Sequence, residues 1–136
     1  MDDTRVFQAF TSQLSKMMDW ISDKIKMYQV ADPKGKHILL ALEEAIVNII
    51  YHAYSYPEGL LEIQVAYKPE SRELNFTLLD QGKPFNPLEY NKIDTTSEVN
   101  KREPGGLGIY FMKKITDHIF YERKGDYNVL HLRNQV

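Results

Sequence analysis

Between residues 44 and 53 the chain reads EAIVNIIYHA, and the interpretation of the whole sequence starts from this stretch. It lies within a segment, from residue 33 to about 54, whose apolar residues recur at helical spacing and predict a long helix. The apolar face of this helix consists of Leu39, Leu42, Ile46, Ile49 and Ala53. Glu44, Asn48 and His52 follow one another at four-residue steps. Because a helix turns ~100° per residue, they drift only ~40° per step and share one stripe away from the apolar face.

This stripe combines an acid, an amide and an imidazole, which together can activate a hydroxyl group and hold a hard cation. Carboxylate and amide oxygens suit Mg²⁺, which keeps waters and substrate phosphates in its coordination shell. The same spacing is also typical of a solvated helix face with ordinary side-chain hydrogen bonds, so the row alone leaves both interpretations open. Glu43, ~100° around the helix from Glu44, is the competing acid.

Upstream of this helix, residues 4–10 predict a short strand or entry segment, and a first helix follows from residue 11. Its apolar residues recur at steps of three and four and form one core-facing side. They are Phe10, Leu14, Met17, Met18, Ile21, Ile25 and Tyr28. We expect Thr11 or Ser12 to be the N-cap of the first helix. Asp32 is the expected cap of the second helix, with Pro33 at its first position.

Downstream, apolar runs and breaker residues predict two antiparallel hairpins and one short helix. The strands are expected over residues 60–67, 74–79, 118–123 and 127–132, and the helix over residues 107–115. From residue 80 to about 106 the sequence has no apolar periodicity. Loops longer than ~12–15 residues are uncommon in compact domains and are usually functional or disordered. This segment is therefore a candidate functional loop.

A second motif, DQGKPFNP, occupies residues 80–87 at the end of an apolar strand. An Asp at a strand end followed by Gly is common in turns. In a binding site, Asp80 would accept a hydrogen bond from the amino group of a base. Gly82 would then let a flat ring approach the backbone.

A third motif, GGLG at residues 105–108, directly precedes the predicted late helix. Glycines there let the backbone turn tightly and direct N–H groups at an anion, and the helix dipole adds to the attraction. The motif lacks the Lys-Ser/Thr ending of a P-loop and does not follow a strand directly. A flexible hinge into the helix is the alternative. Lys101 and Arg102 lie just upstream of this motif. Their side chains could reach phosphates bound there, or they could simply be solvated.

The composition narrows the classes of function. The chain has 136 residues, the size of one domain, and 17 Lys and Arg against 19 Asp and Glu give a net charge of −2. This balance argues against bulk nucleic-acid binding, which requires an excess of basic residues. Without cysteine, disulfides, thiolate nucleophiles and cysteine-based zinc sites are excluded. The sequence contains no apolar run of ~18 residues and no signal peptide, so we expect a cytoplasmic protein without a membrane partner.

Taken in order, the three motifs closely resemble the nucleotide-binding boxes of the GHKL ATPase superfamily, which includes gyrase, a heat-shock chaperone, histidine kinases and MutL. Within it, the chain resembles the anti-sigma factor serine/threonine kinases of bacteria over residues 5–134. The resemblance implies the Bergerat fold. This is a two-layer α/β sandwich in which a mostly antiparallel mixed sheet packs helices on one face. It also implies a single ATP-binding domain, residues 1–136, with a mobile ATP lid at about residues 86–105.

The resemblance also assigns roles to individual residues. Asn48 matches the residue that coordinates the Mg²⁺ ion bridging the triphosphate. Glu44 matches the acid taken as the general base, and Asp80 the residue that recognises the adenine amino group. The other implied nucleotide-binding residues are His52, Gly82, Phe85, Gly105, Gly106, Leu107 and Gly108. Arg102 is the match for a basic residue near the lid that binds a partner.

The implied activity is ATP-dependent phosphorylation of a serine in an anti-anti-sigma protein, combined with sequestration of a sigma factor. The alternative is a catalytically silent, nucleotide-binding switch that holds a regulator without phosphotransfer. A slow stand-alone ATPase, or an unrelated domain with chance motifs, is a further alternative. A histidine kinase would need a phospho-accepting helix upstream, and gyrase-type or MutL-type proteins need a transducer domain. We also expect a homodimer through the sheet or the first helix, where Trp20, Met27 and Tyr28 are candidate contacts.

Overall fold

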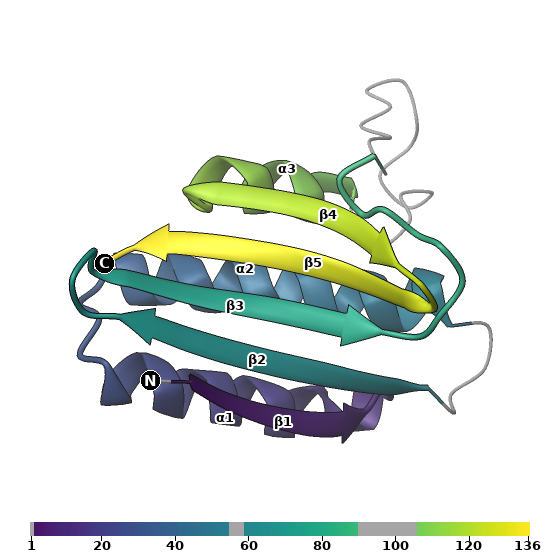
Figure 1. The fold of residues 1–136 in the computed structure, drawn as a ribbon, viewed down its shortest axis with the longest axis horizontal. Coiled ribbons are helices and arrows are strands. Elements are labelled where there is room, and N and C mark those ends of the chain that lie inside the picture. Colours follow the sequence, from purple (N-terminus) through teal and green to yellow (C-terminus); the bar gives the residue numbers. More distant parts are fainter. Residues whose placement is uncertain (1, 55–58, 90–105) are drawn as a thin grey trace.

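The computed structural model describes residues 2–54, 59–89 and 106–136. Its strands are β1 (Asp2–Gln8), β2 (Leu60–Lys68), β3 (Glu73–Asp80), β4 (His118–Lys124) and β5 (Tyr127–Gln135). They form one antiparallel sheet in the order β1-β2-β3-β5-β4. Its α-helices are α1 (Leu14–Met27), α2 (Lys34–Asn48) and α3 (Gly106–Ile115), and they lie on one face of the sheet (Figure 1). The expected two-layer fold is confirmed, although the sheet in these residues is entirely antiparallel rather than mixed.

Side chains alternate along the two central strands and place one row against the helices. The buried apolar residues of β2 and β3 are Leu61, Ile63, Val65, Leu74, Phe76 and Leu78. The register pairs Ile63 with Leu78, so the two buried rows lie side by side on one face. Ile38, Leu42 and Ile46 of α2 are also fully buried and belong to the same core. Apolar residues at every second position give each strand one apolar face, and apolar residues at helical spacing give each helix one apolar side. These two surfaces pack against each other, so the sheet and the helices form two layers.

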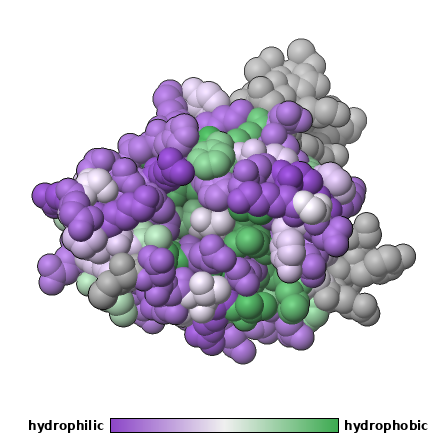
Figure 2. Space-filling model, in the orientation of Figure 1, coloured by the Kyte–Doolittle hydropathy of each residue, from purple (hydrophilic) through white to green (hydrophobic). Residues whose placement is uncertain are grey.

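The opposite face of the sheet is not covered by any of the described helices. Figure 2 shows this face as mostly hydrophilic, with a hydrophobic strip across it. By alternation with buried Phe7 and Leu61, the half-exposed Val6 and Leu60 lie on this side. Two of the proposed dimer contacts are engaged within the chain: Tyr28 stacks on Tyr67, and Trp20 packs edge-on against Phe7. The side chain of Met27 is 57% exposed.

The N-cap predictions for both early helices are wrong. A 3-10 turn, Thr11–Gln13, precedes α1, and Gln13 stands at the N-cap position without a side-chain cap bond. Pro33 stands at the N-cap of α2, and the Asp32 carboxylate lies 3.8 Å from Lys36 Nζ instead. A capping side chain needs a backbone in the extended region. Gln13 and Pro33, with ψ of −6° and −7°, do not have that conformation.

The end of α1 is closed by a Schellman motif. The Val30 N–H donates to the Ile25 carbonyl at 3.2 Å, and the Gln29 N–H to the Lys26 carbonyl at 3.0 Å. Gln29 has a positive φ of 56°, as this motif requires at its turning residue. Lys24, buried in the last turn of α1, forms an ion pair with Asp3 of β1 and thereby joins the helix to the edge strand.

The remaining predicted elements, the two hairpins and the late helix, occur within one or two residues of their predicted bounds, apart from β5, which extends to Gln135. Most of the expected lid, residues 86–105, lies outside the described part of the chain, which stops at Glu89 and resumes at Gly106. Among the residues that the structure describes, no helix is long and apolar enough to cross a membrane.

Candidate functional site

Asn48 occupies the last position of α2 and is fully buried. Its Nδ2 donates to the Glu44 carbonyl at 2.7 Å. Its Oδ1 is buried and accepts no hydrogen bond from any described residue. Leaving a buried acceptor unpaired costs ~1–3 kcal/mol, and a ligand that paired with this oxygen would recover that cost. An amide oxygen is also a ligand that Mg²⁺ accepts, so the residue present here fits the expected ion.

Glu44 lies one turn before Asn48 and contacts the first turn of α3. A Cβ added at Gly108 would overlap the Glu44 carboxylate, so only glycine lets the two approach in this way. Burial raises the pKa of the Glu44 carboxyl, and the nearby charge of Glu43 raises it further. A raised pKa brings a carboxylate closer to the range in which it accepts a proton effectively at neutral pH.

α2 does not end as a regular helix. It continues into a π-helical turn, Ile49–Ala53, and such turns are frequent at functional sites. The His52 ring stacks on Phe85, with 5.2 Å between the ring centroids, so His52 contacts the loop that follows Asp80.

Asp80 ends β3 with 2% of its surface exposed. Its Oδ1 accepts hydrogen bonds from the Gly82 N–H at 2.9 Å and from Asn128 Nδ2 at 2.8 Å. None of the residues that the structure describes donates to Oδ2. Burial raises the pKa of Asp80, and the two hydrogen bonds and the charge of Arg123 only partly oppose this. The site thus holds one carboxylate oxygen in place and leaves the other to accept a donor.

Asn128 is the central residue of this network, and none of the three sequence motifs includes it. It lies opposite Asp80 in the β3–β5 register. Besides its bond to Asp80, Asn128 Nδ2 donates to the Lys83 carbonyl at 2.8 Å. Its Oδ1 accepts from the Tyr121 hydroxyl at 2.5 Å and from the Phe85 N–H at 3.2 Å. The only signal for Asn128 in the sequence is a polar residue near the start of a predicted strand. Its contact with Asp80 could not be predicted, because the pairing of β3 with β5 is not local in sequence.

Gly82 packs against the last residue of the π-helical turn that follows α2. A Cβ there would overlap the Ala53 carbonyl, which also accepts the Lys83 N–H at 2.9 Å. The structure therefore gives a reason for glycine other than the expected approach of a ring. Tyr54, also missed, donates its hydroxyl to the Leu60 carbonyl at 2.6 Å and accepts the Gln81 N–H at 2.8 Å. Burial is the main cause of its raised pKa.

The predicted site residues thus form two groups joined by α2 and its π-helical turn. Glu44, Asn48 and Gly108 make one group, and Asp80 with its loop makes the other. Gly106 and Leu107 are the first residues of α3, which begins at the end of the sheet where β3 ends and β5 begins (Figure 1). Gly105 and Arg102 lie outside the described residues. No group of three or more His, Asp or Glu residues suited to a metal occurs in residues 2–54, 59–89 and 106–136.

Comparison with known proteins places this arrangement in a family. Residues 7–134 match the family model of the histidine kinase-like ATPase domain. The chain is 25% identical over 95 residues to the serine/threonine-protein kinase BtrW of Bordetella bronchiseptica, covering 70% of this chain and 66% of that protein. It is 27% identical over 84 residues to the serine-protein kinase RsbW of Bacillus licheniformis, covering 59% and 52%. It is 25% identical over 114 residues to the anti-sigma F factor of Clostridium kluyveri, covering 84% and 69%.

Solved structures show the same fold at low sequence identity. The histidine kinase domain of the blue-light activated kinase from Erythrobacter litoralis has a TM-score of 0.56 at 13% identity, covering 90% of this chain and 60% of that one. The catalytic domain of histidine kinase ThkA has a TM-score of 0.51 at 13% identity, covering 98% and 95%. The chain spans about half to two thirds of the length of the curated relatives it matches. Because the family model matches nearly the whole sequence, this chain belongs to the family of histidine kinase-like ATPase domains.

Proposed function

We propose that this chain is an ATP-dependent serine/threonine protein kinase that also acts as an anti-sigma factor. It phosphorylates a serine of an anti-anti-sigma protein and otherwise sequesters a sigma factor in the bacterial cytoplasm. The names of three relatives support this proposal, since two are named serine kinases and one an anti-sigma factor. The observation that carries it is the Glu44 carboxylate, held with a raised pKa against the first turn of α3.

The proposed chemistry assigns a task to each part of the site. Asp80 Oδ2 accepts the adenine amino group, and Asn128 keeps the carboxylate fixed. The N–H groups of residues 106–108 face the phosphates at the N-terminal end of α3, where the helix dipole favours negative charge. Asn48 Oδ1 would hold Mg²⁺, which when bound neutralises phosphate charge. The lid, about residues 86–105, would cover the nucleotide, with Gly105 at its end.

Phosphoryl transfer depends on positioning and charge stabilisation more than on covalent chemistry. In the proposed step Glu44 takes the proton of the acceptor serine hydroxyl. The serine oxygen forms its bond to the γ-phosphorus, and the bond between that phosphorus and the β–γ bridging oxygen breaks, which releases ADP. Arg102 contacts the partner protein, and a homodimer presents two such sites.

A phosphorylation assay with a matched acid variant tests the proposal. The chain, Mg·ATP and the cognate anti-anti-sigma protein are incubated, and phosphoserine is quantified by mass spectrometry. Glu44→Gln should lower the rate about a hundredfold or more, as expected for loss of a general base. Glu43→Gln removes the neighbouring exposed acid and should lower transfer far less than Glu44→Gln does, because burial, rather than the Glu43 charge, is the main cause of the raised Glu44 pKa.

Two results would count against the proposal. Wild-type transfer rates in correctly folded Glu44→Gln would remove Glu44 from the role of base. A stable complex with the partner but no phosphoserine after hours with wild-type protein would favour a silent nucleotide-dependent switch instead.

A further inference from the structure

A cavity of about 430 Å³ lies at the opposite end of α2 from the candidate nucleotide site. It is bounded by the α1–α2 connection, the β2–β3 turn and the end of β5. Lys34, which lines it, precedes Glu44 by ten residues in α2, so the two are ~15 Å apart along the helix axis. The volume falls in the range of small-molecule pockets, ~300–1,000 Å³. This cavity is therefore large enough for an organic ligand and separate from the proposed ATP site.

One wall of the cavity is aromatic. The rings of Tyr28 and Tyr67 line it and stack on each other, with 4.7 Å between centroids and 19° between planes. Val30, Pro33 and Val136 add apolar surface to the lining. Aromatic rings prefer offset-stacked or edge-on neighbours, so this wall suits a flat ring better than a flexible polar chain.

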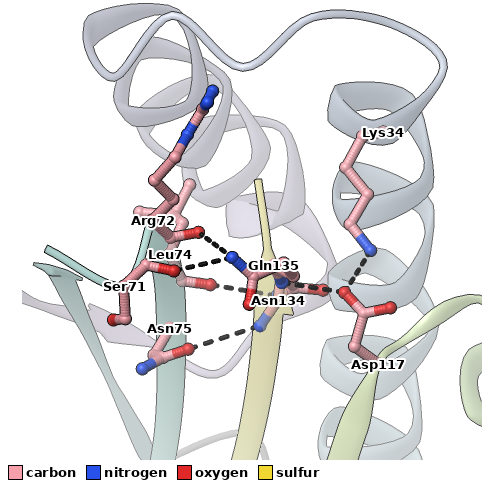
Figure 3. Close-up of polar contacts among 8 residues, drawn as sticks. All are labelled: Lys34, Ser71, Arg72, Leu74, Asn75, Asp117, Asn134 and Gln135. Carbon is pink, nitrogen blue, oxygen red and sulfur yellow. Dashed lines mark hydrogen bonds and ion pairs between the residues drawn. The ribbon is translucent and has the colours of Figure 1, made fainter. Parts of the chain in front are cut away.

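The charged residues of the lining are not all neutralised. Lys34 forms an ion pair with Asp117, and Asp32 lies near Lys36. Arg72 forms no ion pair with any residue in the described part of the chain. Figure 3 shows why: its carbonyl takes part in the hydrogen-bonded network, whereas its side chain extends away from that network. The carbonyl accepts bonds from the Val136 N–H at 2.8 Å and from Gln135 Nε2 at 3.2 Å, so the backbone of Arg72 is anchored while its guanidinium is available.

We propose that this cavity binds a small organic anion that carries a flat ring. The carboxylate or phosphate group of the ligand pairs with the Arg72 guanidinium, whose planar fork matches both groups in two-bond geometry. His37, exposed on the first turns of α2, lines the same space and supplies a second donor. The ring lies along the Tyr28–Tyr67 wall. Asp32 in the lining disfavours a second negative charge on the far side of the ligand.

A titration of the whole ¹⁵N-labelled chain, followed by amide chemical shifts, tests this site. The probes are benzoate, phenyl phosphate and the neutral benzyl alcohol. At least one of the two anions should produce saturable shifts in residues 29–32, Lys34, Arg72 and Gln135. Benzyl alcohol should bind about tenfold more weakly, because a hydrogen bond to a charged group is worth about one decade in affinity.

Arg72→Asn removes the guanidinium without straining the turn, since asparagine tolerates the positive φ of 54° at this position. It should weaken the anion about tenfold. Lys68→Asn removes the same charge from the same hairpin, outside the cavity lining, and should bind as the wild type does. His37→Gln, on an exposed helix position, should weaken binding several-fold and provides a second variant if Arg72→Asn does not fold.

Three outcomes would overturn the proposal. The first is equal affinity for benzyl alcohol and the anions. The second is unchanged anion affinity in both Arg72→Asn and His37→Gln. The third is a set of anion-induced shifts confined to Asp80, Gly82 and Gly108. The last would mean that the probes occupy the nucleotide site. None of these readouts depends on kinase activity, so failure of this proposal and failure of the proposed function are distinguishable.

Discussion

Gly82 and Gly108 are both obstructed at the position of a Cβ, but by different groups. At Gly82 the obstructing group is the main-chain carbonyl of Ala53. At Gly108 it is the carboxylate end of the Glu44 side chain. A main-chain group in a packed helix end cannot move aside, whereas a side chain can adopt another rotamer. The two glycines therefore serve the site in different ways.

Alanine at each glycine should separate stability from activity. Gly82→Ala should lower the free energy of unfolding by ~1–3 kcal/mol, the usual cost of overpacking a rigid site. Gly108→Ala should change it little but displace the Glu44 carboxylate and lower phosphotransfer. Urea unfolding and the phosphoserine assay measure the two effects. Full transfer by Gly108→Ala would show that the close contact with Glu44 is not needed.

The buried charge of Asp80 lowers the stability of the unliganded protein. Because burial raises its pKa in the folded state, the charged carboxylate opposes folding, and its neutral form does not. Asp80→Asn should therefore stabilise the unliganded protein at pH 7. The gain should be complete above the raised folded pKa. It should fade as the pH falls toward and below 3.8, the ordinary value, where the carboxyl is protonated in both states.

Urea unfolding of wild type and Asp80→Asn between pH 3 and pH 8 measures this difference. Asparagine keeps an oxygen for the Gly82 N–H and Asn128 bonds, so the comparison isolates the charge. A variant that is less stable than wild type at pH 7 would contradict the argument.

At the scale of elements, α2 connects the two ends of the molecule. Its first residue, Lys34, is paired with Asp117 at the junction of α3 and β4, and its last residue is Asn48. Asp117 also accepts the Gln135 N–H at 2.8 Å (Figure 3). This carboxylate thus holds α2, the α3–β4 junction and β5 together.

Asp117→Asn should destabilise the protein modestly at neutral pH. Partial burial raises the pKa of Asp117, but the bonds from Lys34 and Gln135 outweigh it, so the pKa is lowered overall. The charged form therefore supports folding above the ordinary value of 3.8, and this support is lost as the pH falls through the lower folded pKa. The pair is partly exposed to solvent, so we expect a loss of under ~1 kcal/mol, smaller at high salt.

Urea unfolding at pH 7 and at pH 3, in low and high salt, tests this expectation. Asp126→Asn, in the β4–β5 turn, removes an acid that forms no ion pair within the described residues and serves as the control. An equal loss at pH 3 and pH 7 in Asp117→Asn would point to packing rather than charge.

At the scale of the whole molecule, nucleotide binding should appear as stability. A ligand that binds only the folded state, at a hundred times its dissociation constant, adds ~2.7 kcal/mol. For a domain of this size the melting temperature should rise by several degrees, at ~2–8 °C per kcal/mol. Thermal unfolding with and without Mg·ATP measures the shift, which Asp80→Asn should abolish. No shift in wild type at millimolar Mg·ATP would contradict binding at this site.

Local sequence patterns were enough to predict the helices, the strands and the order of the motifs. Apolar periodicity is a local property, so the amphipathic helices and alternating strands could be predicted from spacing. The motif order led to the family that the comparisons support. The N-caps predicted for α1 and α2 are wrong, because a cap depends on the backbone conformation of a single residue, which apolar spacing does not encode.

The assembly of the candidate site depends on contacts between segments that lie far apart in the sequence. Asn128 meets Asp80 because β5 inserts beside β3, a pairing of segments far apart in sequence. Glu44 meets Gly108 because α3 packs on α2, and His52 stacks on Phe85 because the loop after β3 folds back against the π-helical turn. These contacts depend on the register and packing of distant elements. Local spacing encodes which face of an element is buried, but not which distant residue it will contact.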